Sequence, residues 1–257
     1  MISNLAYVHP DAKIGNNVTI EPFASVYGNV EIGDNTWIGP NAVVMDYSRI
    51  GKNCKIFPTA TIGAIPQDLK FKGEPALAEI GDNCMIRECV TVNRGTADRM
   101  TTKIGNNCLL MAYVHVAHDC IIGNNVIIAN SVGLSGHITI EDYAIIEGMA
   151  AAQQFITIGA HSFVGGYTQI RKGVPPFIRV ARDPLQFIGV NTVGLARRGF
   201  SKEAIKEIED IYRIIFVRGH NITNALEIVE QEIPDSEHRK TILDFIRAQK
   251  DGIVRGI

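Results

Sequence analysis

The sequence predicts a parallel β-helix of short coils, followed by a small α-helical domain. Ile-Gly pairs begin at positions 14, 32, 38, 50, 62, 80, 104, 122 and 158, and every interval between them is a multiple of six residues. Neither an α-helix nor a simple amphipathic strand has that period. From residue 201 the pattern changes to apolar residues spaced three and four apart, which is typical of helices.

Two positions in each six-residue repeat carry side chains suited to an interior. One holds a large aliphatic residue, such as Ile14, Ile32 or Ile50. The other lies two residues earlier and holds a small or β-branched residue, such as Ala12 or Val30. This pattern describes a short strand followed by a turn. Three such strands close a triangular coil of 18 residues, so residues 18 apart are expected to stack at the sheet spacing of about 4.8 Å.

The six-residue pattern is interrupted at two places. Residues 64–77 and 93–101 are polar, contain Gly or Pro, and fall out of phase with the repeat. We expect both segments to leave the coil as loops. Loops held on a rigid scaffold are where binding groups tend to lie.

The repeat ends at Val174-Pro175-Pro176, because two prolines cannot supply the hydrogen-bond donors of a sheet. Helical spacing follows in three segments, residues 201–216, 222–233 and 235–250. We therefore predict a β-helix over residues 1–190 and an α-helical domain over residues 191–257. The apolar faces of these helices are expected to cover the last coil or a neighbouring subunit, since an open β-helix end is an unprotected edge.

Composition excludes several classes of protein. The chain has 257 residues, with 25 Lys and Arg against 27 Asp and Glu, and its net charge of -2 gives no global reason to expect a nucleic-acid partner. No apolar run approaches the roughly 18 residues of a membrane span. Residues 1–4 lack the basic and apolar regions of a secretory signal. We expect a soluble, cytoplasmic protein.

Cysteine usage favours neither a disulfide framework nor a zinc knuckle, because the five cysteines are an odd number and contain no CxxC pair. Four of them fall on the small inward phase and are predicted to be buried thiols of the core: Cys54, Cys84, Cys108 and Cys120. Cys89 is off phase, and we assign it no function.

Three histidines fall on neither inward phase, so the repeat projects them outward: His115, His118 and His137. His118, Gly136 and Gln154 lie 18 residues apart and form one column. Asp119 and His137 form the neighbouring column. A base, an acid that can orient it, a second imidazole and a glycine N–H thus converge on one outer face. Such a cluster suits abstraction of a hydroxyl proton beside an oxyanion donor.

Two other interpretations of the histidines compete with this one. The first is that they are ordinary surface residues. The second is a zinc site, because His115 and His118 are three residues apart and His137 would be a third ligand.

Five stretches of the sequence, spread over essentially the whole chain, resemble one family: IPQDLKFKGE (65–74), IRECVTVNRGT (86–96), HVAHDC (115–120), GLSGH (133–137) and GVNTVGLARRGFS (189–201). They are similar to those of the UDP-N-acetylglucosamine 3-O-acyltransferases. These enzymes catalyse the first step of lipid A biosynthesis and take the acyl chain from acyl carrier protein. The resemblance implies an all-β left-handed parallel β-helix with a small C-terminal α-helical domain, and a homotrimer with sites between subunits. It implies no metal and no other cofactor, because the thioester donor is already activated.

The resemblance also assigns roles to the histidine cluster. His118 would be the general base that takes the proton of the sugar 3-hydroxyl, which then attacks the thioester of a 3-hydroxyacyl chain. Asp119 would orient the imidazole, and the Gly136 N–H would face the oxyanion. Substrate-positioning roles are implied for Gln67, Asp68, His115, His137 and Gln154. Nucleotide and phosphate contacts are implied for Asn191, Arg197 and Arg198, since guanidinium groups suit phosphate oxygens.

The acyl donor has its own predicted contacts. Gly148 and Gly166 lie 18 residues apart and leave a shallow lane on one outer column. The resemblance places the end of the acyl groove at Gly166, and a glycine at this position predicts a long acyl chain. Acyl carrier protein is acidic, so a basic docking patch is expected, with candidates at Lys70, Lys72, Arg171, Lys172 and Arg179.

The chain departs from the family pattern at Gln153, where the family often has His, and at Val193, where it commonly has an acidic residue. The first bears on catalytic tuning and the second on nucleotide recognition. The acceptor is UDP-N-acetylglucosamine or its 3-amino analogue. A zinc hydratase similar to the γ-class carbonic anhydrases and a non-catalytic β-helix scaffold are the alternative functions, although the outward cluster around His118 argues against the scaffold.

Overall fold

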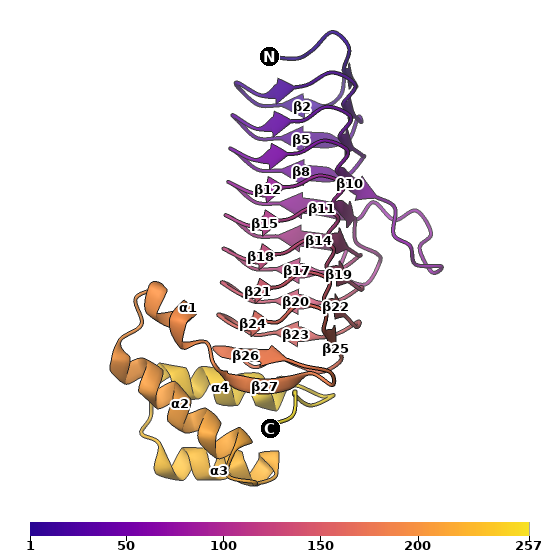
Figure 1. Ribbon diagram of the computed structural model, residues 1–257. Helices are drawn as coiled ribbons and strands as arrows, with labels where there is room; N and C mark the ends of the chain where they lie inside the picture. Colours follow the sequence, from indigo (N-terminus) through magenta and orange to yellow (C-terminus); the bar gives the residue numbers. More distant parts are fainter. Residues whose placement is uncertain (257) are drawn as a thin grey trace.

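The protein is a three-sided column of parallel strands with four helices packed at its C-terminal end (Figure 1). The computed structural model describes residues 1–256. Each coil contributes one short strand to each of three sheets, so that strands three apart along the chain are hydrogen-bonded neighbours. The parallel β-helix predicted from the six-residue period is therefore confirmed.

The strands of the three sheets are short, mostly of two residues. The nine-stranded sheet contains β1 (Tyr7–Val8), β4 (Ser25–Val26), β7 (Val43–Val44), β10 (Thr61–Ala64), β13 (Thr91–Asn93), β16 (His115–Val116), β19 (Gly133–Leu134), β22 (Ala151–Ala152) and β25 (Gln169–Ile170). The eight-stranded sheet contains β2 (Lys13–Ile14), β5 (Val30–Ile32), β8 (Ser48–Ile50), β11 (Leu77–Ile80), β14 (Thr101–Ile104), β17 (Ile121–Ile122), β20 (Thr139–Ile140) and β23 (Thr157–Ile158). The ten-stranded sheet contains β3 (Thr19–Ile20), β6 (Trp37–Ile38), β9 (Lys55–Ile56), β12 (Met85–Ile86), β15 (Leu109–Leu110), β18 (Ile127–Ile128), β21 (Ile145–Ile146), β24 (Phe163–Val164), β26 (Ile178–Ala181) and β27 (Gln186–Val190).

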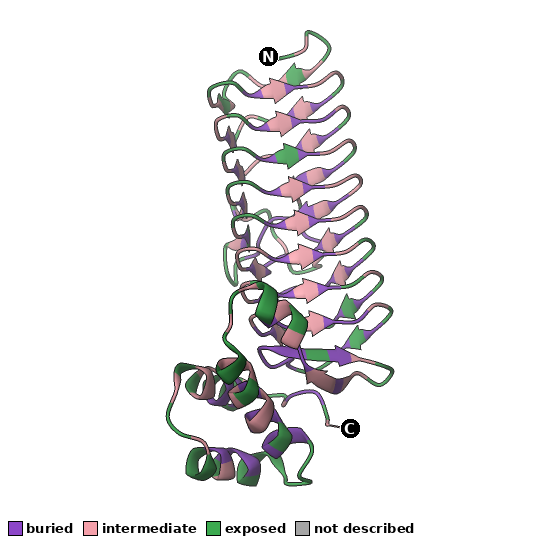
Figure 2. Cartoon of the chain, turned by 60° about the vertical axis from the view of Figure 1, so that its left-hand side comes forward, coloured by how far each residue is buried: buried purple, intermediate pink, exposed green. Residues whose placement is uncertain are grey.

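The register follows the predicted 18-residue stacking. His115 pairs with Gly133, which pairs in turn with Ala151. Both inward phases line a continuous core, in which Ile38 and Leu134 are fully buried. Figure 2 shows buried residues alternating along the coils with exposed and partly exposed ones. Burial of this aliphatic core stabilises the stacked coils. Backbone hydrogen bonds, such as that from the Gly33 N–H to the Ile50 carbonyl, link each coil to the next.

An Ile-Gly pair such as Ile32-Gly33 opens a turn whose residues are dictated by the next coil. A Cβ added at Gly33 would lie 2.7 Å from the backbone carbon of Gly51, so only glycine fits. The next residue, Asp34, accepts a hydrogen bond from the Asn16 N–H at 2.8 Å and so joins two coils. Asn35 follows with φ of 59°, a conformation that asparagine adopts more readily than most residues. The Ile-Gly spacing is thus a direct consequence of coil stacking.

The four cysteines predicted to be buried are buried, and each thiol donates to a backbone carbonyl of a neighbouring coil. Burial raises the pKa of Cys120 to about 12, so this group stays a thiol at neutral pH. Cys89 is partly exposed, and its Sγ lies 3.0 Å from the Thr59 hydroxyl.

Two loops leave the column on the same side. The first excursion, residues 65–76 between β10 and β11, projects away from the coils, and the second, residues 94–100 between β13 and β14, lies beside it (Figure 1). Arg94 of the second excursion is buried, with its guanidinium carbon 4.8 Å from the ring of Tyr47 and 5.3 Å from the ring of Phe71. This arginine therefore ties the first excursion to the column.

The C-terminal end corrects one prediction. The ten-stranded sheet does not stop at the prolines, because β26 continues it in parallel with β24 and β27 then pairs antiparallel with β26. The prolines break only the six-residue pattern. Four helices follow: α1 (Thr192–Arg197), α2 (Lys202–Phe216), α3 (Ile222–Glu232) and α4 (Glu237–Ala248). The sequence did not predict α1, whose six residues are too short to show helical periodicity.

Helix α2 closes the end of the column. Tyr212 is fully buried and its hydroxyl donates to the carbonyl of Pro176 at 2.6 Å, while Phe216 stacks on Phe187 of β27 with ring centroids 4.6 Å apart. The helices thus cover the last coil, which is one of the two arrangements expected from the sequence. Within residues 1–256, no helix combines the length and apolar character needed to cross a membrane.

Candidate active site

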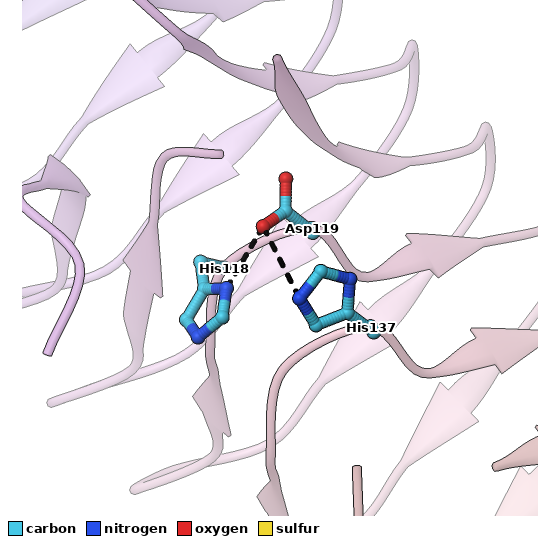
Figure 3. Close-up of side chains that lie close together, drawn as sticks. All are labelled: His118, Asp119 and His137. Carbon is cyan, nitrogen blue, oxygen red and sulfur yellow. Dashed lines mark hydrogen bonds and ion pairs between the residues drawn. The ribbon is translucent and has the colours of Figure 1, made fainter. Parts of the chain in front are cut away.

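His118 and Asp119 lie at the corner where the nine-stranded sheet turns into the eight-stranded sheet, between β16 and β17. His118 Nδ1 is 2.8 Å from Asp119 Oδ2 (Figure 3). Both side chains point outside the coil, as the phase predicts, but neither is a surface residue: His118 is 6% exposed and Asp119 is 0% exposed. The interpretation of His118 as an ordinary surface histidine is therefore wrong.

The second excursion loop buries Asp119. The Thr96 N–H donates to Oδ1 at 3.0 Å, the Thr96 hydroxyl donates to Oδ2 at 2.6 Å, and the Arg99 N–H donates to Oδ1 at 3.2 Å. Burial raises the pKa of Asp119, but hydrogen bonds from Thr96 and His118 outweigh it and hold the pKa below its ordinary value. The sequence analysis missed Thr96 and Arg99, because residues in a loop carry no periodic signal.

Gly136 stacks directly on His118, as the 18-residue spacing predicts. A Cβ added at Gly136 would lie 2.5 Å from His118 Cε1, so any side chain there would displace the imidazole. The Gly136 N–H donates no hydrogen bond to another group of residues 1–256. Glycine at this position therefore leaves room for the ring and a backbone donor beside it.

His137 forms the second imidazole of the cluster. Its Nε2 lies 3.7 Å from Asp119 Oδ2 (Figure 3). The same nitrogen lies 3.6 Å from Asp98 Oδ2, and the ring stacks on Phe155 with centroids 4.6 Å apart. Burial lowers the pKa of His137, and the nearby Asp119 carboxylate only partly offsets this effect. The imidazole is thus mostly neutral at pH 7.

Asp68, in the first excursion loop, approaches the other nitrogen of the His118 ring. Asp68 Oδ2 lies 3.8 Å from His118 Nε2.

His115 is the first residue of β16. Its Nδ1 lies 2.7 Å from the Thr91 hydroxyl, and burial lowers the pKa of His115. Gln67 and Gln154 are exposed.

The other predicted site residues lie at different corners of the column. Gly148 and Gly166 stack as predicted, with a Cβ on Gly166 placed 2.9 Å from the Gly148 carbonyl oxygen. They lie where the ten-stranded sheet turns into the nine-stranded sheet, between β21 and β22 and between β24 and β25. One copy of the chain therefore separates the predicted acyl lane from His118.

The residues expected to contact the nucleotide lie at the third corner, beside α1. The Asn191 amide is used within the fold, because it caps α1 through the Gly194 N–H and donates to the carbonyl of His161 at 2.9 Å. The Arg198 guanidinium lies 5.4 Å from the Tyr143 ring centroid, and its buried Nη1 has no hydrogen-bond partner within residues 1–256. Arg197 is exposed.

The candidate docking lysines and arginines form two separate groups. Lys70 and Lys72 are exposed on the first excursion, and the others are exposed near the C-terminal end of the coils: Arg171, Lys172 and Arg179. The two positions that depart from the family pattern, Gln153 and Val193, are also exposed.

In the described part of the chain, one group of side chains has the spacing of metal ligands: His118, Asp119 and His137. His115 does not belong to this group, so its proposed place among the zinc ligands is wrong. The Asp119 oxygen nearest the imidazoles already accepts hydrogen bonds from the Thr96 hydroxyl and His118. His118 Nδ1 and Asp119 Oδ2 are thus engaged with each other.

Two family models match the chain. The model described as UDP N-acetylglucosamine O-acyltransferase, domain 2, matches residues 174–256. The model of the bacterial transferase hexapeptide, a unit of six repeats, matches residues 11–36, 29–64 and 101–136. The triangular coil and these matches define the class as a hexapeptide-repeat acyltransferase with a left-handed parallel β-helix.

Similar proteins narrow the class to one family. The acyl-(acyl-carrier-protein)–UDP-N-acetylglucosamine O-acyltransferase of Aliivibrio salmonicida is 47% identical over 99% of this chain and 100% of its own length. That of Alkalilimnicola ehrlichii is 50% identical over 97% of both chains. The crystal structure of a UDP-N-acetylglucosamine acyltransferase from Bacteroides fragilis is 51% identical, covers 99% of this chain and 100% of that one, and has a TM-score of 0.97. The chain belongs to the family of acyl-carrier-protein-dependent UDP-N-acetylglucosamine O-acyltransferases.

His161, at the α1 corner, generates a prediction about acid stability. Its ring lies between Tyr143 and Phe177, with centroid distances of 4.8 and 5.7 Å, and its buried Nδ1 has no partner within residues 1–256. Burial, followed by the nearby charge of Arg198, lowers the pKa of His161 from 6.5 to about 4. The unfolded chain binds a proton here below pH 6.5 and the folded chain does not, so stability falls as the pH drops from 6.5 towards 4.

We therefore expect His161→Phe, which keeps the stacked ring but cannot titrate, to lose less stability than the wild type over this pH range. Urea denaturation between pH 7 and 4.5 measures the difference, with His220→Phe at an exposed position as the control. Equal losses in the wild type and His161→Phe would contradict the assignment.

Proposed function

We propose that the protein transfers a 3-hydroxyacyl chain from acyl carrier protein to the 3-position of UDP-N-acetylglucosamine, the first step of lipid A biosynthesis. The observation that carries the proposal is the hydrogen-bonded pair of His118 and Asp119, with Gly136 stacked against the imidazole. Family membership supports both substrates, because the curated relatives are named for acyl carrier protein and UDP-N-acetylglucosamine. The proposed site of action is the cytoplasm.

In the proposed reaction His118 is the general base. Its Nδ1–H donates to Asp119, which leaves a lone pair on Nε2 to accept the proton of the sugar 3-hydroxyl. The hydroxyl oxygen then forms a bond to the thioester carbonyl carbon. As the tetrahedral intermediate collapses, the carbon–sulfur bond breaks and the thiolate of the carrier takes the proton back from His118. The products are the acyl ester and the free carrier thiol.

Two neighbours stabilise the charges of this reaction. Asp119 is held as a carboxylate by its hydrogen bonds and stabilises the imidazolium that forms when His118 takes the proton. The Gly136 N–H, which has no acceptor within residues 1–256, is available to the oxyanion of the intermediate. No cofactor is needed in this mechanism.

The surrounding polar residues are proposed to position the substrates. Asp68 faces His118 Nε2 and is placed to accept a hydrogen bond from the sugar. We propose the same kind of role for Gln67, His115, His137 and Gln154, and nucleotide contacts for Asn191, Arg197 and Arg198. Acyl carrier protein would dock on the basic groups at Lys70 and Lys72 and at Arg171, Lys172 and Arg179.

We propose that the active unit is a homotrimer with each site between two copies. The groups assigned to the base, the acyl lane and the nucleotide lie at three different corners of one column, so a second copy is needed to bring them together. The outward side chains of the ten-stranded sheet are partly exposed and largely apolar, which suits contact with another copy: Trp37, Met85, Leu109, Ile127, Ile145 and Phe163. Those of the eight-stranded sheet are largely charged.

Replacement of His118 tests the proposed base. His118→Asn keeps an amide donor near Asp119 but removes Nε2, and should lower kcat by about 10²–10⁴ without a loss of fold. The assay is mass spectrometry of the product formed from UDP-N-acetylglucosamine and a 3-hydroxyacyl carrier protein. His220→Ala is the control at an exposed histidine, and His118→Ala checks that the loss does not depend on the amide. A folded His118→Asn that keeps more than half its turnover would refute the assignment.

Replacement of Gly166 tests the acyl lane. Gly166→Met should shift the preference from long to short acyl donors, because the side chain fills space taken by terminal methylenes, each worth about 0.8 kcal/mol, or roughly fourfold, when buried. A Cβ at this position meets the Gly148 carbonyl oxygen at 2.9 Å, so Gly166→Ala is the control for backbone strain. Both variants are compared with the wild type on carrier-protein thioesters of increasing length. An unchanged profile in Gly166→Met would mean that the groove ends elsewhere.

A further inference from the structure

Thr96 contacts the carboxylate of Asp119 more extensively than any other residue of the second excursion. Its hydroxyl and the His118 ring share Asp119 Oδ2, at 2.6 and 2.8 Å. Its N–H reaches the other oxygen, Oδ1, at 3.0 Å. Together with the Arg99 N–H, this gives the carboxylate four donors, two on each oxygen.

This arrangement determines which nitrogen of His118 carries the proton. An ionised carboxylate can only accept hydrogen bonds, so Asp119 is the acceptor in all four of these contacts. His118 Nδ1 must then be a donor, and the lone pair of the neutral ring lies on Nε2, which faces Asp68. The four donors also prevent the carboxylate from rotating away from the ring.

The loop that carries Thr96 is itself firmly anchored. The Arg94 N–H donates to the Ala64 carbonyl and the Gly95 N–H to the Leu77 carbonyl, each at 3.0 Å, so the loop is tied to both ends of the first excursion. A Cβ on Gly95 would lie 2.4 Å from the Thr101 nitrogen, which only glycine avoids. Thr96 is thus held in place without help from a substrate.

We infer that Thr96 is a positioning residue for the reaction: its hydroxyl fixes the Asp119 carboxylate and, through it, the tautomer and orientation of His118. The inference rests on the proposed role of His118 as the base. The charged or titratable groups that contact the pair are Asp68 from the first excursion, Arg99 from the second, and His137 from the next coil. Asp98 of the second excursion lies against His137. None of these supplies the hydroxyl donor.

Thr96→Val removes the hydroxyl but keeps the branched shape and the N–H, whereas Thr96→Ser keeps the hydroxyl. We expect Thr96→Val to lower kcat about 10- to 100-fold, the scale seen when outer hydrogen bonds that orient metal-ligating histidines are lost, with KM for both substrates within about twofold. Thr96→Ser should recover most of the activity. Thr101→Val is the control for a threonine at the end of the same loop.

The pH profile gives a readout that loss of packing alone would not move. Without the Thr96 hydroxyl the carboxylate can rotate away from the ring and stabilises the protonated imidazole less. The acid limb of kcat/KM should therefore move to lower pH in Thr96→Val and stay at its wild-type position in Thr96→Ser. A wild-type kcat and an unmoved acid limb in Thr96→Val would overturn the inference.

The ¹⁵N spectrum of the enzyme labelled at histidine tests the tautomer without any substrate, using His118→Asn to assign the signal. The expected result is a proton on Nδ1 in the wild type and a mixture of tautomers in Thr96→Val. A wild-type ring protonated on Nε2 would overturn the inference even if Thr96→Val did not fold. If His118→Asn remains active, the proposed function fails; if His118→Asn is inactive while Thr96→Val is fully active, only the role of Thr96 fails.

Discussion

The structure depends on one constraint, the stacking of each 18-residue coil on the next at the spacing of a β-sheet. Stacking requires two inward side chains in every six residues, and it leaves no room for a Cβ at turn positions such as Gly33. It also turns every outward position into a column that runs along the protein. The His118 site is one such column, in which Gly136 leaves the space that the imidazole occupies. Core, turn and site therefore follow from the same repeat.

The sequence predicts the periodic parts of this structure well, because stacking converts residue spacing directly into contact. The buried cysteines and the contact between His118 and Gly136 follow from phase alone. The burial of Asp119 does not, because the residues that cover it lie in a loop whose path is set by contacts such as that of Arg94 with Phe71. Strand β26 escapes prediction for a related reason: it continues the sheet after the six-residue pattern has ended.

The excursions supply the chemistry that the repeat cannot. A bare outward histidine on a β-helix would be solvated and free to rotate. Here the second excursion surrounds Asp119 with donors, and the first brings Asp68 to the opposite face of the imidazole. The two loops are joined through backbone hydrogen bonds at Ala64 and Leu77. The column holds the His118 side chain, and the loops supply the polar groups around the His118–Asp119 pair.

The central claim is that residues from different corners of the column form one site only when copies of the chain meet. Mixing two impaired variants tests it most directly: His118→Asn, altered at one corner, and Arg197→Glu, altered at another, are co-expressed and purified as mixed trimers. In a ring of three, every mixed trimer holds one intact pair among its three sites, so about one third of wild-type turnover should return. Mixed trimers no more active than the separate variants would show that one copy carries the whole site and would contradict this account.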